Sequence, residues 1–161
     1  MIDGKGDDDA WGGAPVISDF RESRPVEGAE PKLRTEARVA YDARNLYVFV
    51  RAFDPHPDSI TRRLARRDSD VESDWITVYV DSYHDRRSGF IFAVNPAGVK
   101  QDRLLYNDGN EDDAWDGVWE VATRVDSAGW SAEFRIPLSQ LRYAVKPENV
   151  FGFALRRSIS R

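Results

Sequence analysis

The clearest chemical candidates lie in an acidic stretch, residues 107–116, between two strand-like runs. This stretch surrounds Gly109 with carboxylate and amide oxygens, which are the hard ligands that Ca²⁺ prefers. Its spacing does not match the EF-hand loop, in which acidic residues alternate before a fixed glycine. We predict a structural calcium site here, and the alternative is a solvated acidic loop. The predicted ligands are Asp108, Asn110, Asp112, Asp113 and Asp116.

Aromatic side chains flank the same acidic stretch. An exposed ring can stack on the C–H groups of a pyranose, while amide and imidazole groups hydrogen-bond its hydroxyls. Trp115 and Tyr106 supply such rings, and His84 and Asn95 lie in loops between strand-like runs. We predict these four residues as ligand-binding. The alternatives are that Trp115 closes one end of the core and that His84 is simply exposed.

The sequence offers little support for catalysis. Glycoside hydrolysis needs two converging carboxylates, and among 28 acidic residues no pair is singled out. His56 and His84 are the only histidines, and there is no nucleophile-elbow motif. Met1 is the only methionine, which argues against a Met–His haem site. We therefore predict a domain that is not an enzyme and carries no haem.

Arginine side chains cluster at positions 62, 63, 66 and 67, a spacing that predicts one face of a short helix over residues 59–68. Such a face could bind phosphates or anionic sugars. Acidic residues are interleaved or follow closely at positions 68, 70, 72 and 74, which favours a local salt-bridge network. The net charge of −5 and the lack of a nucleic-acid motif argue against a nucleic-acid partner.

The chain has the length of one domain, because 161 residues can bury roughly 70% of the surface of the unfolded chain. It has no cysteine and therefore no disulfide framework. No apolar run approaches the ~20 residues that span a bilayer. The first residues lack the features of a signal peptide, and the last ones are strand-like. We expect residues 1–161 to be one domain from the N-terminal part of a longer protein.

Apolar side chains alternate with polar ones along most of the chain, which is the period of a β-strand. The clearest run places Trp130, Ala132, Phe134 and Ile136 on one face. Trp75, Trp119 and Trp130 lie within such runs and are predicted to be core residues. We predict strands near residues 33–41, 45–53, 75–82, 89–95, 99–106, 118–125, 129–136 and 150–158, with a further one near 15–20.

Short turns containing Gly or Asn separate the strands at residues 42–45, 95–98 and 126–129, so their neighbours are antiparallel. Residues 137–141 resemble one helical turn. Eight or nine short strands without an internal repeat predict an all-β antiparallel sandwich, of the jelly-roll or immunoglobulin-like kind.

Read in order, the sequence landmarks resemble family 9 carbohydrate-binding modules, which are β-sandwiches with DOMON-like relatives. The resemblance covers nearly the whole chain. It is closest to bacterial proteins in which such a module precedes a predicted outer-membrane barrel. The landmarks are Ile2-Asp3-Gly4, Trp11, Val39-Ala40-Tyr41-Asp42, Asn45-Leu46-Tyr47-Val48, Asp54-Pro55, Ser73-Asp74-Trp75, Val80-Asp81, Phe92-Ala93-Val94-Asn95, Gly98, Trp119, Gly129-Trp130-Ser131-Ala132-Glu133 and Ile136-Pro137.

The resemblance implies a non-catalytic carbohydrate-binding module of a secreted, periplasmic or outer-membrane-associated bacterial protein. Its implied partners are a glycan or cell-envelope polysaccharide and an adjoining domain of the same chain, and its implied role is in polysaccharide breakdown. The better known sugar-binding members carry Trp, Glu and Arg where this chain has Val71, Thr77 and Ala93. One alternative is therefore a structural or interaction domain that has lost the sugar site and docks on an adjoining barrel or partner. Another is an accessory module of a glycoside hydrolase.

Overall fold

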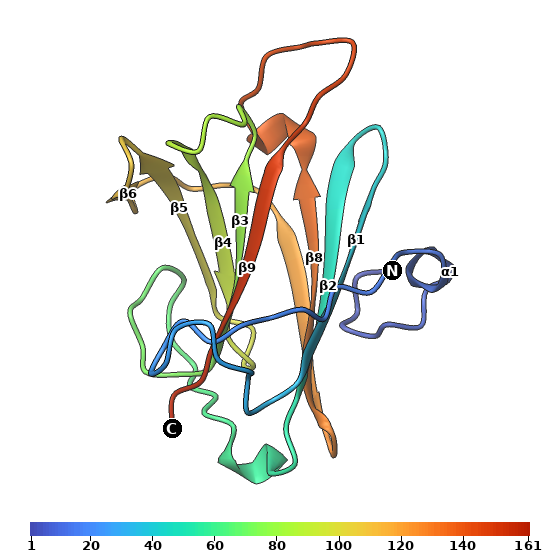
Figure 1. The fold of residues 1–161 in the computed structure, drawn as a ribbon, viewed down its shortest axis with the longest axis vertical. Coiled ribbons are helices and arrows are strands. Elements are labelled where there is room, and N and C mark those ends of the chain that lie inside the picture. Colours follow the sequence, from blue (N-terminus) through green and yellow to red (C-terminus); the bar gives the residue numbers. More distant parts are fainter.

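The computed structural model describes all residues, 1–161. Two antiparallel β-sheets pack face to face (Figure 1). The four-stranded sheet has the order β1-β2-β8-β7, and the five-stranded sheet has the order β6-β5-β4-β3-β9. The predicted all-β sandwich is confirmed. Its strands are β1 (Thr35–Tyr41), β2 (Asn45–Phe53), β3 (Trp75–Asp81), β4 (Gly89–Val94), β5 (Lys100–Tyr106), β6 (Asn110–Asp112), β7 (Glu120–Asp126), β8 (Gly129–Pro137) and β9 (Gly152–Ser158).

Helical structure is limited to α1 (Asp9–Gly12) and two 3₁₀ turns, η1 (Pro57–Ser59) and η2 (Leu138–Gln140). The helical turn predicted at residues 137–141 is confirmed by η2. None of these helices has the length and apolar character that a membrane span requires. The strand predicted near residues 15–20 is reduced to a single bridge between Ile17 and Ala37.

The core lies between the two sheets, and the alternation of the strands determines which side chains fill it. On β8 the side chains of Trp130, Ala132, Phe134 and Ile136 are fully buried. Each large apolar side chain buried in this way contributes about 1.5–3 kcal/mol. Trp119 stacks on Phe134 with 5.9 Å between ring centroids, so two of the three predicted core tryptophans are confirmed. The third, Trp75, is only half-buried and lies on the face of β3 that points away from the core.

The helix predicted over residues 59–68 is wrong. Beyond η1, residues 61–74 form an irregular segment, here called the strap, which runs beside β5 (Figure 1). Its polar backbone groups bond to other elements: the amide of Asp68 donates to the carbonyl of Lys100, and the carbonyl of Arg63 accepts from Asn95. A helix would place like charges one turn apart, and these tertiary hydrogen bonds outweigh the local pattern.

The N-terminal segment, residues 1–14, lies against the outer face of the four-stranded sheet (Figure 1). Three N–H groups converge on the buried carboxylate of Glu133 on β8. They come from the backbones of Asp3 and Gly4, each at 2.9 Å, and from the indole of Trp11 at 3.1 Å. The sequence landmarks that contain Asp3 and Glu133, 130 residues apart, thus lie together in the structure and attach the N-terminal segment to the sheet.

Candidate functional site

A pocket of about 390 Å³ opens at the end of the sandwich where β4 begins and β5 ends. It brings together two of the predicted ligand-binding residues, Tyr106 and Trp115, and adds Tyr83 from the loop after β3. The side chains of Tyr83 and Tyr106 are about half exposed, so their rings are accessible to a ligand. The remaining lining consists of Ser82, Ser88, Gly89, Phe90, Leu104, Leu105, Asp112 and Arg142.

Trp115 forms one wall of this pocket and also packs against the core. Its ring centroid lies 5.1 Å from that of Phe90 and 5.8 Å from that of Phe92. Gly117 fits closely beneath it, because a Cβ atom at this position would lie 2.6 Å from the indole ring. Both interpretations of Trp115 therefore apply, since one part of the ring closes the core and another lines the pocket.

Few polar groups in the pocket are free to meet a ligand. The hydroxyl of Ser82 donates to the carbonyl of Arg142, and that of Ser88 donates to Asp85. The guanidinium of Arg142 has no hydrogen-bond or ion-pair partner, and Asp112 accepts only the amide of Ala114. These two groups and the hydroxyls of Tyr83 and Tyr106 lie beside aromatic rings, an arrangement that suits the hydroxyls and C–H face of a sugar.

The other two predicted ligand-binding residues do not line the pocket. His84 is exposed in the loop next to Tyr83. Asn95 is fully buried, and its side chain donates to the carbonyl of Arg63 and accepts the amides of Ala97 and Val99. Asn95 therefore stabilises the β4–β5 turn and does not face a ligand. The sequence contained a signal for this role, because Asn commonly bonds the backbone two residues ahead in a turn.

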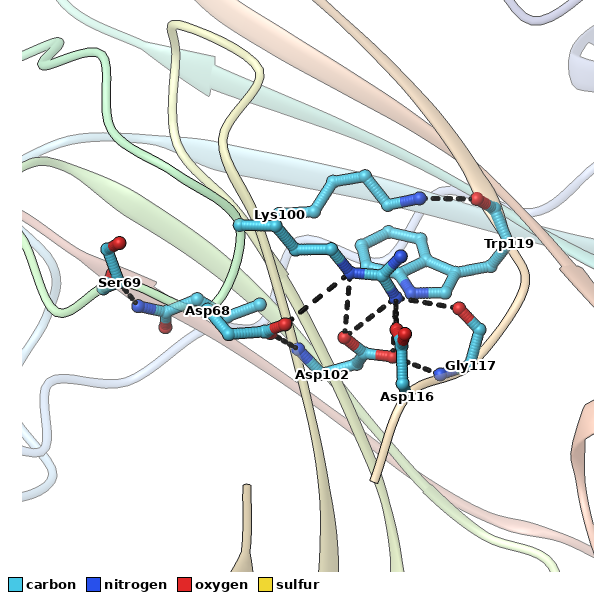
Figure 2. Close-up of polar contacts among 9 residues, drawn as sticks. Asp68, Ser69, Lys100, Asp102, Asp116, Gly117 and Trp119 are labelled. Carbon is cyan, nitrogen blue, oxygen red and sulfur yellow. Dashed lines mark hydrogen bonds and ion pairs between the residues drawn. The ribbon is translucent and has the colours of Figure 1, made fainter. Parts of the chain in front are cut away.

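A cluster of three carboxylates, Asp68, Asp102 and Asp116, lies beside the pocket, with oxygens within 4.8 Å of one another (Figure 2). The guanidinium of Arg67 lies among them. Its Nη2 atom is 2.8 Å from Asp102 and 2.6 Å from Asp116, and its Nε atom is 3.5 Å from Asp68. The strap, β5 and the segment before β7 meet at this one cation.

The structure does not assemble the predicted calcium ligands. Asn110 and Asp112 belong to β6, which pairs with β5 and spreads the acidic stretch along a hairpin. Asp108 lies 3.6 Å from Arg87, and no three carboxylates of the predicted set, Asp113 included, lie together. Only Asp116 joins a carboxylate cluster, and that cluster already holds Arg67. The predicted carboxylates are therefore not gathered into one set of ligands in this structure.

Sequence reasoning did not identify Asp102 and Asp68 as members of this cluster. Asp102 is fully buried and pairs in register with Phe92, so it points between the sheets. A signal was present, because the alternation of β5 places an acidic residue on the same face as Leu104. A charged side chain at a core position requires a partner, but the sequence does not say where that partner lies.

Burial and charge alter the ionisation of several groups here. Burial lowers the pKa of Lys100, whose Nζ donates to the carbonyl of Trp119 at 2.6 Å. Burial raises the pKa of Asp68, to which the nearby charge of Asp102 adds. Burial acts to lower the pKa of Arg67, but the hydrogen bonds and charge of Asp102 outweigh it and raise that pKa. Arg67 is therefore a permanent cation in the cluster.

The predicted local network of arginine salt bridges is confirmed in part. Arg63 lies 3.7 Å from Glu72, and Arg67 pairs with its neighbour Asp68. The stronger contacts of Arg67, to Asp102 and Asp116, are long-range. Arg62 and Arg66 take part in no ion pair. The network therefore joins the strap to β5 rather than closing on itself.

The sequence resemblance assigns the Glu and Arg of the better known sugar-binding modules to two positions on the outer face of the five-stranded sheet. Here Thr77 and Ala93 occupy them, and they are directly paired between β3 and β4. Both are buried, and neither carries a charge. Val71, at the position of the stacking Trp, lies in the strap, where its carbonyl accepts the indole N–H of Trp75.

The fold and the aromatic pocket define a β-sandwich binding module, and comparison with known proteins agrees. The model of the "carbohydrate family 9 binding domain-like" family matches residues 2–157. The chain therefore belongs to this family, which consists of carbohydrate-binding, non-catalytic modules. No curated protein sequence matches the chain.

Solved structures show the same fold at low sequence identity. The chain is similar to a family 9 carbohydrate-binding module from Caldicellulosiruptor kristjanssonii in complex with cellotriose. The TM-score is 0.68 and the identity 20%, over 99% of this chain and 72% of that one. The glucose complex of such a module from the same organism gives 0.66 and 20%, over 96% and 71%. A protein from Bacteroides uniformis ATCC 8492 gives 0.70 and 14%, over 91% and 72%.

Proposed function

We propose that this chain binds a carbohydrate, without modifying it, in the pocket formed by Tyr83, Tyr106 and Trp115. The observation that carries this proposal is the combination of three aromatic side chains with one free guanidinium and one largely free carboxylate. Aromatic rings stack on the C–H face of a sugar, and the two charged groups hydrogen-bond its hydroxyls. The family to which the chain belongs supports the same ligand class.

The pocket supports binding rather than hydrolysis. Asp112 is its only acidic residue, whereas glycoside hydrolysis requires a pair of carboxylates on opposite sides of the scissile bond. The cellotriose and glucose complexes of the related modules make short β-glucans and their monosaccharide the first ligands to test.

The wider setting of this activity is also a proposal. The resemblance to modules that precede an outer-membrane barrel favours a secreted or cell-envelope protein in which the module retains a glycan during polysaccharide breakdown. The same role would serve as an accessory module of a glycoside hydrolase. In either case the partner is a glycan or cell-envelope polysaccharide, and an adjoining domain of the same protein uses the bound material.

A second candidate function is a docking domain that has lost its sugar site. The observation that favours it is the replacement of the charged residues of the better known sugar site by the buried pair Thr77 and Ala93. This alternative predicts no saturable glycan binding at any pocket of the domain.

Titration calorimetry with cellotriose, glucose and soluble cell-wall fragments tests the proposal. Tyr83→Ala and Tyr106→Ala each remove a half-exposed ring, and each should weaken binding about two- to tenfold. Tyr41→Ala is the matched control, because this tyrosine is 82% exposed and lies outside the pocket. Binding that is unchanged in both pocket variants would place the ligand elsewhere. A lack of binding to every glycan would favour the docking domain.

A further inference from the structure

Arg67 connects parts of the chain that are far apart in sequence. It lies on the strap, and its guanidinium contacts Asp102 on β5 and Asp116 in the segment that leads to β7. The strap is attached at the same place through Asp68, whose amide donates to the carbonyl of Lys100 and whose carboxylate accepts the amide of Asp102. The guanidinium is thus held at a defined position beside β5.

The carboxylate of Asp102 requires this cation. Asp102 is fully buried and faces the interior between the sheets, where an unpaired charge is strongly unfavourable. Both of its oxygens accept from Nη2 of Arg67, at 2.9 and 2.8 Å. Asp102 also accepts the amide of Gly117. The carboxylate of Asp102 is therefore satisfied by one ion pair and one backbone N–H group.

The same pair fixes the backbone beneath Trp115. The amide of Gly117 donates to Asp102, and the carbonyl of Gly117 accepts Nη2 of Arg67 at 2.7 Å. A Cβ atom at Gly117 would lie 2.6 Å from the indole of Trp115, so the backbone and the ring are close neighbours. Any shift of Gly117 would therefore move the ring that forms one wall of the pocket.

We propose that Arg67 is a positioning residue for the Trp115 wall of the pocket, and that it acts as a tethered cation in a place where three carboxylates would otherwise hold a divalent ion. The effect on glycan binding rests on the proposed function, but the effect on Trp115 does not. In the native chain the guanidinium satisfies the cluster, so calcium is not needed for its stability.

This role makes a specific prediction for Arg67→Ala. Removal of the guanidinium leaves the oxygens of Asp68, Asp102 and Asp116 close together without a counterion, which is a set of ligands that suits Ca²⁺. Millimolar Ca²⁺ should therefore raise the Tm of Arg67→Ala and restore its Trp115 signals. The Tm of the native chain should change neither with Ca²⁺ nor with EDTA.

The experiment compares the native chain, Arg67→Ala, Arg67→Lys and the control Arg66→Ala, each with EDTA and with Ca²⁺. Arg66 takes part in no ion pair, so its loss should change none of the readouts. The ligand-free readout is the set of NMR cross-peaks between the Trp115 and Phe90 rings, which are in contact. These cross-peaks should weaken in Arg67→Ala with EDTA and return with Ca²⁺. Arg67→Lys keeps the charge and should retain them in part.

Glycan affinity is measured separately. Arg67→Ala should bind cellotriose about two- to tenfold more weakly with EDTA, as expected for a displaced aromatic wall, and recover with Ca²⁺. Unchanged Trp115 cross-peaks in Arg67→Ala would overturn the positioning role, whatever the glycan result. A Tm of Arg67→Ala that does not respond to Ca²⁺ would overturn the tethered-cation role. If the cross-peaks respond but no variant binds a glycan, only the proposed function fails.

If Arg67→Ala does not fold, Arg67→Lys provides the second variant. It keeps a positive charge for Asp102 but lacks the guanidinium that contacts Asp102 and the carbonyl of Gly117 together, so the domain should remain folded. Weaker Trp115–Phe90 cross-peaks in Arg67→Lys than in the native chain would support the positioning role, and unchanged cross-peaks would count against it.

Discussion

Two segments without regular sheet structure cover opposite sides of the sandwich, and each is attached through a buried carboxylate. The N-terminal segment is held by Glu133, which accepts three neutral N–H groups and contacts no cation. The strap is held by Asp102, which is paired with the charged guanidinium of Arg67. Both carboxylates are at most 1% exposed. The chain thus stabilises a buried carboxylate charge in two ways: by neutral N–H donors in one case and by a cation in the other.

The two carboxylates also differ in where their partners come from in the chain. The backbone N–H groups that bind Glu133 come from consecutive residues in one tight turn, so a short local motif suffices. The guanidinium that binds Asp102 lies at the end of a long side chain and reaches three separate segments. Glu133 is therefore satisfied mostly by backbone groups, whereas the charge of Asp102 is balanced by one long side chain.

The largest expected effect is that of Trp11→Ala on the N-terminal segment. Trp11 is 3% exposed, packs on Phe49 at 5.8 Å between ring centroids, and donates to Glu133. Loss of a buried Trp side chain should reduce the free energy of unfolding by about 3–5 kcal/mol, measured by urea denaturation. Trp11→Phe keeps most of the ring and should lose only about 1–2 kcal/mol. Equal losses in the two variants would show that the hydrogen bond, and not packing, attaches the segment.

Glu133→Gln tests whether the negative charge of Glu133 contributes to the attachment of the N-terminal segment. The amide oxygen of Gln can accept the two backbone N–H groups, but its NH₂ group would then face the indole N–H of Trp11. We expect a loss of about 1–3 kcal/mol in urea denaturation, because one buried donor is left without an acceptor. An unchanged midpoint would mean that the negative charge of Glu133 contributes nothing to the attachment.

The smallest expected effect concerns a third buried carboxylate, Asp74. It has neither the three N–H donors of Glu133 nor the paired guanidinium of Asp102. Its Oδ1 atom accepts the amide of Ser160, and its Oδ2 atom has no partner. Burial raises the pKa of this carboxyl. Its protonated form is therefore favoured in the folded state, and stability is lost as the pH rises through the folded-state pKa.

Asp74→Asn cannot ionise and keeps the acceptor for Ser160. The variant should be more stable than the native chain at pH 7, by less than either loss described above, and the difference should disappear below the unfolded pKa of Asp. Urea denaturation midpoints at pH 7 and at a pH below the unfolded pKa of Asp provide the measurement. Greater stability of the native chain at pH 7 would show that the charge of Asp74 is needed by Arg157, which lies near it.

The candidate site was only partly accessible from the sequence. Tyr106 and Trp115 were identified because aromatic residues stood beside a polar stretch, and the structure places them in one pocket. Tyr83 was not identified, since a single aromatic in a loop carries no periodic signal. Asn95 was assigned to the ligand although it is buried, because an amide in a turn has the same sequence signal whether it faces solvent or the chain.

The sequence by itself determined the family, the turns and every strand except β6, because the alternation of side chains along a strand and the choice of residues in a tight turn are local properties. The strand from Asn45 to Phe53 was recognised with its bounds intact. Only the tertiary structure decided that residues 59–68 form no helix and that Arg67 belongs to Asp102 and Asp116. The physical reason is that an ion pair between distant segments depends on where the sheets bring those segments, and no local pattern of residues records that position.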